Sequence, residues 1–433
     1  MSISPVAAQT CVQTSDLASL SATDARAALR RAVAITSPTR PSSDLFRSFS
    51  SIQPVCADSL ALVSVWGNAP SERAWKVLPV TAVTYWNSAY PRTVNDGASW
   101  RGAGLNFEAT GGAEFRWRFL RGAVAPEFAY NANADHPATM STLPDRSRFA
   151  SPYHLGIDYP KRMGADPVTS ITSGQSYIQA ELGPVAATFS AENIWIGAAQ
   201  VYPILLSSTA PGFPHLRIGT TRARNIAGVF NAEFQLFFAS LRESEYFDSI
   251  GGNDSHFFMT AMVTVEPRFL PGLYLSVARA DHDTANATGQ GLGFYLERIF
   301  ESPFGGSGNS GNRFEGNAIG LILVRWVLPE SGFEAYAEWS KEDTPGGLED
   351  LLREPDWTQA YVLGFQKAFK TQQRLTRVYG ELIHLGESAP VRAGRGLFSY
   401  YTHGTVIQGH TNRGQLLGAA IGPGSDAQLI GVD

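Results

Sequence analysis

Histidine and acidic residues in two segments of this chain have the side chains needed for metal chemistry. His403 and His410 lie seven residues apart in a glycine-rich segment, a spacing that matches no common metal-ligand pattern. Residues 281–283, Asp-His-Asp, start like a calcium loop. However, Ala285 stands at the third ligand position and no bidentate glutamate follows. We therefore expect hydrated loops at both places, and neither a metal nor a cofactor.

Motifs for covalent or hydrolytic catalysis are missing from the sequence. It contains no Gly-x-Ser-x-Gly elbow, no His-Glu-x-x-His pair, no phosphate loop and no Cys-x-x-Cys. Glu334 and Glu338 share one face of an extended segment, but the strand rise separates them by about 13 Å, too far for paired glycosidase carboxylates. We read them as wall residues of a lumen, and we expect no enzyme activity.

A regular alternation over residues 112–121 indicates which elements position these side chains. In a strand the aromatic residues Phe115, Trp117 and Phe119 share one face, and Glu114, Arg116 and Arg118 share the other. A soluble sheet would turn the aromatic face inward. A transmembrane barrel would turn it to lipid and the charged face to a wet lumen.

The same alternation recurs along the chain, and its repetition favours the barrel. It is clear at 232–239, 333–339 and 377–382. It is weaker at 80–90, 176–182, 184–190, 257–265, 272–280, 317–328 and 357–369. These lengths match the roughly 9–11 residues of a tilted membrane strand, and the inward set stays charged from strand to strand. We predict an all-β, large antiparallel outer-membrane barrel.

Composition agrees with this prediction and narrows the function. Of 433 residues only 17% are charged, below the roughly 25% typical of soluble domains. No run of about 18 apolar residues exists, which excludes a helical membrane protein. The formal net charge of −5 argues against a nucleic-acid partner.

The connections between strands alternate in length, as in outer-membrane barrels. Short ones are expected at 109–112, 183–184 and 329–332. Long ones, rich in Gly, Asn, Asp, Ser and Pro, are expected at 131–175, 202–227, 281–316, 341–356 and 387–412.

The N-terminal part has a different texture. Residues 15–50 have helical spacing, with a second short helix beginning between Ser42 and Phe49. We divide the chain into a signal-peptide remnant (1–8), a periplasmic helical segment (9–76) and the barrel (77–433). Cys11 and Cys56 are the two cysteines, and a bridge between them would add about 4 kcal/mol in an oxidising compartment. Two unpaired thiols are the alternative.

Three segments resemble the Wzi family of outer-membrane proteins, which help attach capsular polysaccharide to the bacterial surface. They are Pro-Arg-Thr-Val-Asn-Asp-Gly at 91–97 with Trp-Arg-Gly-Ala-Gly-Leu-Asn at 100–106, the segment 192–216, and Thr-Asn-Arg-Gly-Gln-Leu-Leu-Gly-Ala-Ala-Ile-Gly at 411–422. The resemblance spans roughly residues 80–425. It implies a short N-terminal periplasmic helical segment and a barrel of about 16–18 strands with a polysaccharide-recognising surface. Family members continue beyond the third segment, so we expect further strands after Asp433.

With this resemblance, arginine and aromatic side chains become candidate glycan contacts. Guanidinium groups pair with uronate carboxylates, and aromatic faces stack on sugar C–H surfaces. The candidates are Arg116, Arg118, Arg377, Trp100, Trp195, Tyr202 and Phe213, with the further loop aromatics Trp86, Tyr90, Tyr153 and Tyr159. At any single position, bracing of the barrel by an arginine or membership of an interfacial aromatic girdle is the competing interpretation.

The sequence therefore predicts a monomeric, non-enzymatic, lectin-like outer-membrane protein of capsule or exopolysaccharide assembly. Its expected partners are capsular or extracellular polysaccharide and outer-membrane lipid. A porin or solute channel is the alternative, and it requires an open lumen. An outer-membrane lipid hydrolase would need a Ser or Asp beside a His at the membrane rim, and the sequence places no such pair.

Overall fold

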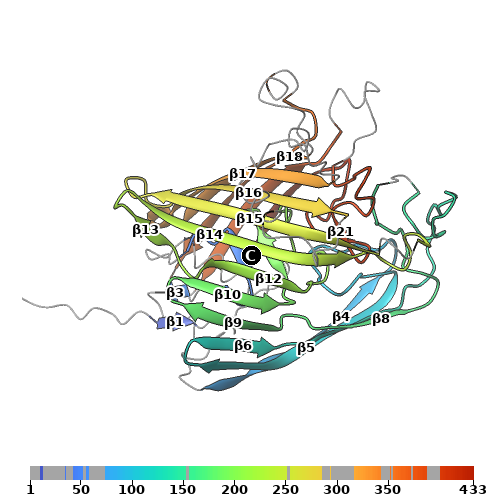
Figure 1. Cartoon of the computed structure of the whole chain (residues 1–433), viewed down its shortest axis with the longest axis horizontal. Coiled ribbons are helices and arrows are strands. Elements are labelled where there is room, and N and C mark those ends of the chain that lie inside the picture. Colours follow the sequence, from blue (N-terminus) through green and yellow to red (C-terminus); the bar gives the residue numbers. More distant parts are fainter. Residues whose placement is uncertain are drawn as a thin grey trace, which may run out of the picture.

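Strands with alternating apolar and polar side chains pair side by side into a curved sheet, with one kind of side chain on each face. The computed structural model describes residues 10–12, 35, 42–51, 55–57, 74–152, 156–250, 254–284, 293, 316–342, 352, 355–371, 374–387 and 400–433. In these residues the chain forms one large antiparallel barrel wall (Figure 1). No helix in the described part of the chain is long and apolar enough to cross a membrane.

Seventeen strand segments make up the described ring. They are β4 (Trp75–Asn87), β5 (Gly104–Trp117), β6 (Leu120–Val124), β7 (Glu127–Asn131), β8 (Val168–Thr172), β9 (Tyr177–Leu182), β10 (Val185–Ser190), β12 (His215–Thr220), β13 (Arg224–Ile226), β14 (Phe230–Arg242), β15 (Ser255–Pro267), β16 (Leu273–Asp283), β17 (Asn317–Leu328), β18 (Phe333–Glu342), β19 (Gln359–Lys370), β20 (Leu375–His384) and β23 (Asp426–Val432). β6 with β7, β8 with β9, and β12 with β13 are consecutive parts of one strand, so the described part of the wall has fourteen strands.

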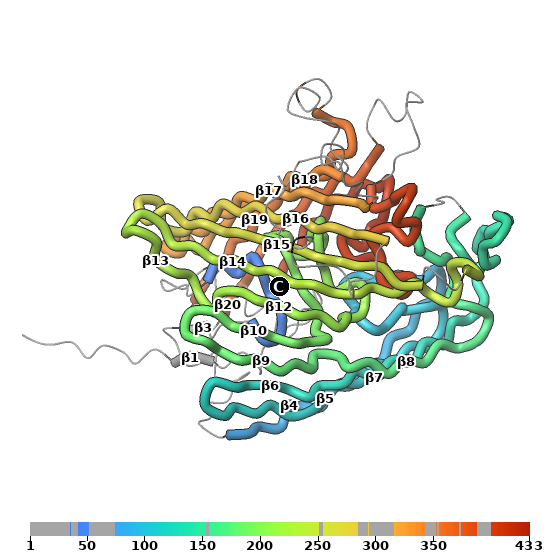
Figure 2. The backbone as a smooth tube through the Cα atoms, in the orientation of Figure 1, coloured from blue at the N-terminus to red at the C-terminus, as the bar shows by residue number. Residues whose placement is uncertain are grey.

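Small elements that are not strands of the barrel wall complete the described structure. They are β1 (Thr10–Val12) paired with β3 (Val55–Ala57), β2 (Phe46–Ser48) paired with β11 (Ile194–Ile196), β21 (Thr411–Asn412) paired with β22 (Gln415–Leu416), and the single turn η2 (Pro329–Ser331). Figures 1 and 2 show tight turns at the left end of the barrel and the longer connections at the right. We call these the short-turn end and the long-loop end.

The predicted assignment of strand faces is confirmed. In β14, Phe234 is exposed on the outer face, whereas its neighbour Gln235 is buried inside. In β18, Glu334 and Glu338 point inward, as expected for wall residues. The outer surface therefore carries apolar side chains along each strand, as a barrel in lipid requires.

The segment 112–121 was expected to be one strand, and that expectation is wrong. β5 ends at Trp117, and Arg118 and Phe119 form the turn that leads into β6. Arg118 has a φ of 54°, which breaks the extended backbone. Both residues therefore lie at the short-turn end and not on opposite faces of a strand.

Some connections were also placed wrongly. Residues 109–112 lie inside β5, where a Cβ on Gly112 would come within 1.9 Å of the Val124 carbonyl oxygen of the paired strand. Glycine here thus permits close packing of strands instead of a turn. The expected long loops 131–175 and 202–227 contain β8, β12 and β13. The turns at 183–184 and 329–332 are confirmed.

The barrel is not a wet tube, because residues 191–214 fold into it. This interior loop packs Ile194, Ile204 and Leu205 against inward-facing apolar side chains of the wall such as Leu321 and Val362. The Glu338 carboxylate accepts hydrogen bonds from the backbone N–H groups of Ala199 (2.9 Å) and Ile204 (3.2 Å). Glu381 accepts from the N–H groups of Gln200 (2.6 Å) and Tyr202 (2.8 Å). Carboxylates of the wall thus hold the loop by its backbone.

A second segment, residues 42–51, also enters the barrel, and we call it the N-terminal insert. The expected short helix starting between Ser42 and Phe49 is wrong, since β2 is extended and pairs with β11 of the interior loop. Ser50 N–H donates to the buried Glu192 at 2.7 Å. Of the rest of the expected helical segment, residues 15–34 and 36–41 lie outside the described residues.

Candidate functional site

The three segments that resemble Wzi lie at the same end of the barrel, although they are far apart in sequence. Gly97 N–H donates to the Ser208 carbonyl at 2.6 Å, joining the first segment to the second. Gln415 of the third segment donates to the carbonyl oxygens of Thr209 (2.9 Å) and Gly97 (3.3 Å). Ser207 N–H donates to the Leu417 carbonyl at 2.7 Å. These bonds fix the three loops to one another at the long-loop end.

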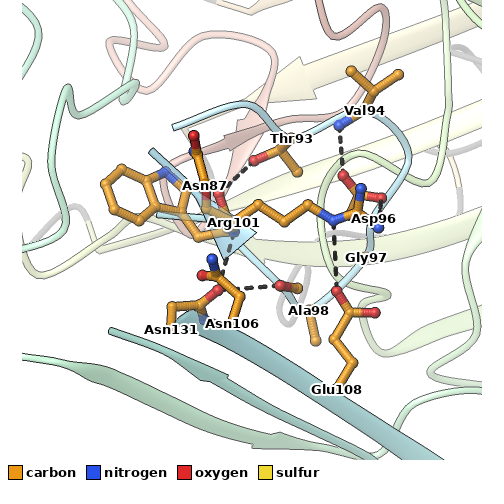
Figure 3. Close-up of polar contacts among 12 residues, drawn as sticks. Asn87, Thr93, Val94, Asp96, Gly97, Ala98, Arg101, Asn106, Glu108 and Asn131 are labelled. Carbon is orange, nitrogen blue, oxygen red and sulfur yellow. Dashed lines mark hydrogen bonds and ion pairs between the residues drawn. The ribbon is translucent and has the colours of Figure 1, made fainter. Parts of the chain in front are cut away.

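The first segment is rigid because of a buried charge network (Figure 3). Arg101 lies 2.6 Å from the Asp96 carboxylate and 3.7 Å from Glu108. Asp96 also accepts the N–H of Val94 at 2.7 Å. Burial raises the pKa of Asp96 to about 7, and the adjacent Arg101 opposes this rise. Thr93 closes the turn by donating to the Trp100 carbonyl at 2.8 Å.

A cavity of about 390 Å³ opens beside these joined loops. It takes residues from all three segments and from the connection between β7 and β8. Its lining is Tyr90, Pro91, Thr93, Trp100, His136, Pro137, Ala138, Thr139, Tyr159, Pro160, Lys161, Thr209, Gln415 and Leu416. Lys161 is the one lysine or arginine in this described lining, which contains no carboxylate.

The lining provides the two kinds of contact that sugars require. Ring faces stack on C–H surfaces, while hydroxyl, amide and ammonium groups bond to sugar hydroxyls. Tyr90 is 62% exposed and packs edge-on against the His136 ring, with centroids 5.8 Å apart. Deeper in, Lys161 lies over the Tyr159 ring at 4.9 Å, and burial lowers its pKa. The lining therefore combines aromatic rings, both exposed and buried, with polar groups.

Of the predicted glycan contacts, Trp100 lies in this cavity, 4% exposed. Trp195 does not, because β11 places it inside the barrel, 1% exposed, under the Arg47 guanidinium. Phe213 is buried against Phe237 and Phe258. Tyr202 is half-buried in the interior loop. The expectation that Trp195 and Phe213 contact glycan is corrected, since neither ring has a face open to a ligand.

The three predicted arginines are not brought together. Arg116 and Arg118 are exposed at the short-turn end, away from the cavity. Arg377 is buried inside and donates to Gln200 (3.2 Å), Gln366 (3.1 Å) and Asp433 (2.8 Å). It therefore braces the wall against the interior loop, which was the competing interpretation for an inward arginine.

Sequence reasoning missed Lys161, His136 and Gln415 as cavity residues. Gln415 lies within the third resembling segment, so the segment itself was a signal. His136 and Lys161 adjoin Pro137 and Pro160 in the longest expected loop, and nothing in their spacing predicts that they meet.

The expected hydrated loops around the histidines are wrong as well. His410 is buried and forms a chain with His282 (2.8 Å) and His256, ending on the Leu205 carbonyl at 2.6 Å. Burial lowers the pKa of His410 to about 4, so its imidazole is neutral near pH 7. Residues 281–283 belong to β16 and are also buried. In the described chain, no three His, Cys, Asp or Glu side chains are placed to hold a metal ion.

The family profile for the capsule assembly protein Wzi matches residues 88–432. The chain belongs to the Wzi family. This match includes all three segments that meet at the cavity, and it confirms the resemblance found in the sequence. No curated protein matches the sequence significantly.

Solved structures support the same fold. The chain is similar to Wzi of Escherichia coli, whose structure is described as an outer-membrane, carbohydrate-binding β-barrel involved in group 1 capsule assembly. The TM-score is 0.55 at 12% identity, over 98% of this chain and 80% of that one. An anion-selective porin from Comamonas acidovorans gives a TM-score of 0.26 at 11% identity, over 70% and 88% of the two chains. That likeness is too low to support an argument.

Proposed function

We propose that this Wzi-family chain is an outer-membrane, lectin-like protein that binds capsular or extracellular polysaccharide at the long-loop end. The main support for this proposal is that the three family segments meet at one cavity, which is lined by aromatic rings and hydrogen-bonding groups. The carbohydrate binding described for the Escherichia coli relative supports the same function. The chain holds the polymer at the cell surface as a monomer.

Binding of purified capsular polysaccharide to the detergent-solubilised chain tests this proposal. Tyr90→Ala and His136→Ala should each weaken binding roughly threefold to tenfold, the effect of one lost aromatic contact. Phe269→Ala is the matched control, because Phe269 is an equally accessible ring at the opposite end. Unchanged binding in both cavity variants would reject the cavity as the glycan site.

We propose further that the protein acts without chemistry on the polymer. The described cavity lining lacks the pair of carboxylates that glycoside hydrolysis needs. Polysaccharide incubated with the chain should keep its length in gel filtration.

The porin alternative is disfavoured by the filled interior. Two segments occupy the barrel, and both are bonded to buried carboxylates of its wall or of each other. A planar-bilayer recording should show no steady conductance, and a stable open channel would favour the porin.

We place the N-terminal segment in the periplasm. It was expected to span residues 9–76, but Trp75 and Lys76 already belong to β4 of the barrel wall. The N-terminal insert supports this placement, since Ser50 and Ser51 line a small hollow with Thr221 and Arg222 at the short-turn end. β1 pairs with β3 so that Cys11 lies opposite Cys56, a register compatible with the Cα spacing of disulfides. The bridge stays a prediction. A thiol reagent should label the unfolded chain after reduction and not before it.

A further inference from the structure

The short-turn end carries a ring of basic side chains at the outer rim of the barrel. The exposed members are Arg116, Arg118, Arg222, Arg268, Lys370 and Arg374. They come from the ends of β5 and β19, from the turns after β5, β15 and β19, and from the short break between β12 and β13, so they are distributed around the barrel. Among described residues at this rim, the carboxylates with more than a third of the side chain exposed are Glu330, Glu181 and Asp433. Arg121 holds Glu181 at 2.9 Å, and Arg377 binds Asp433. The rim is therefore strongly positive.

Exposed aromatic rings alternate with these cations. Trp117 and Phe119 flank Arg118, Phe269 follows Arg268, and Phe369 precedes Lys370. The Arg118 guanidinium lies 5.2 Å from the Trp117 ring centroid. Aromatic rings settle at the boundary between hydrocarbon and headgroups, and an adjacent cation reaches outward to the phosphate layer.

The opposite rim has the reverse balance. Among the residues that the structure describes at that end, the exposed carboxylates are Asp135, Asp145, Asp166, Glu245, Asp254, Glu387 and Asp426, and the exposed cations are Arg92, Arg148, Arg242 and Arg413. The two ends of the barrel would therefore attract headgroups of different charge.

We infer that the short-turn rim binds the phosphate headgroups of anionic phospholipids in the leaflet that surrounds it. A bilayer is a partner that can meet cations distributed around the whole barrel at once, whereas a folded protein or a glycan chain would meet one side. Charge complementarity selects anionic lipids, because basic residues near a membrane surface gain affinity from each negative headgroup. This inference concerns the end opposite the cavity, so it stands apart from glycan binding.

The test measures lipid selectivity of the full chain in phosphatidylcholine vesicles. Spin-labelled phosphatidylglycerol and phosphatidylcholine are compared by the fraction each contributes to the motionally restricted shell around the protein. The wild type should prefer phosphatidylglycerol about threefold at low salt, and about 0.5 M NaCl should abolish most of this preference. The variant Arg118→Gln/Arg268→Gln/Arg374→Gln removes half of the six rim cations and should show a clearly smaller preference at low salt.

The control Arg148→Gln/Arg242→Gln/Arg413→Gln makes the same charge change at the long-loop rim and should keep the preference. Heat-modifiable gel mobility checks that each barrel is assembled, and the single variant Arg268→Gln with the wild-type salt titration provides the test if the triple variant fails to assemble. An undiminished preference in the rim variant, or an equal loss in the control, would overturn the inference. The absence of any preference in the wild type would overturn it as well. Polysaccharide binding should be unchanged in the rim variant, which separates this outcome from failure of the proposed function.

Discussion

The two ends of the barrel use the same residue types in different arrangements. At the long-loop end, Tyr90, Tyr159 and Lys161 line a cavity to which four connections contribute residues. At the short-turn end, Phe269 and Arg268 project outward from a tight turn. Aromatic and basic residues thus form an enclosed site at one end and an open rim at the other.

The two ends differ because the connections between their strands differ in length. Long connections can fold over and bond to each other, as Gly97, Ser208 and Gln415 do, and a cavity is left beside their junction. A turn of two residues such as Arg118-Phe119 has no neighbour to fold against, so its side chains face the surroundings. Loop length therefore decides whether such residues can enclose a ligand.

The largest expected effect comes from removing a carboxylate that holds the interior loop. Glu381→Ala should lower the free energy of unfolding by about 3–5 kcal/mol, because each buried donor left without an acceptor costs about 1–3 kcal/mol. Those donors are the N–H groups of Gln200 and Tyr202 and the Tyr336 hydroxyl at 2.8 Å. Urea unfolding followed by tryptophan fluorescence gives the value.

The matched control for this change is Glu330→Ala, an exposed carboxylate at the short-turn end, which should shift stability by no more than about 0.5 kcal/mol. If the two variants unfolded alike, the interior loop would not depend on the carboxylates of the wall.

A smaller loss of stability is expected when a charge is placed on the outer surface, and its size should differ between the middle of a strand and the rim. Leu363→Arg, on the outward face near the middle of β19, should cost about 2–4 kcal/mol, because a cation there meets hydrocarbon. Trp117→Arg, next to the short turn, should cost about 0–1 kcal/mol, because its charge reaches the headgroups. Equal costs in lipid-based unfolding experiments would contradict the assigned position of the membrane.

The smallest effect concerns pH at the long-loop end. Asp158 accepts two hydrogen bonds from Ser244 (both 2.6 Å), and burial raises its pKa from 3.8 to about 6. A raised pKa means that the folded state favours the protonated form, so this contribution to stability is present below pH 3.8 and is lost as pH rises through about 6. In the variant Asp158→Asn, the midpoint temperature of thermal unfolding should change less with pH over that range. A wild-type slope retained in the variant would assign the effect to another group.

The sequence could predict the strands because a barrel wall in lipid has two chemically different faces. The alternation in β14, β18 and β20 therefore reported both the element and its orientation. The prediction of a strand was wrong at Arg118 and Phe119, because the same alternation of residue types continues through a turn. The alternation also failed at 109–112, where glycines permit close strand packing.

The site was less predictable, for a physical reason. Trp195 and Arg377 are residue types that often contact ligands. Here both are buried in the barrel, because carboxylates of distant strands hold the interior loop in the lumen. Tyr90 and His136 lie in two different loops, and loops lack the repeating pattern that would predict from sequence which side chains meet. The resemblance to Wzi identified the loops that meet, and it could not identify the side chains that face the cavity.

The most direct test of the glycan-binding cavity is photocrosslinking in capsulated cells. A photoreactive phenylalanine analogue replaces Tyr90 in one strain and Phe269 at the opposite end in another. We predict that irradiation attaches capsular polysaccharide to the chain labelled at position 90 and not to the chain labelled at 269. Attachment at 269 alone, or at neither position while capsule remains bound to the cells, would contradict the assignment of the long-loop end to polysaccharide.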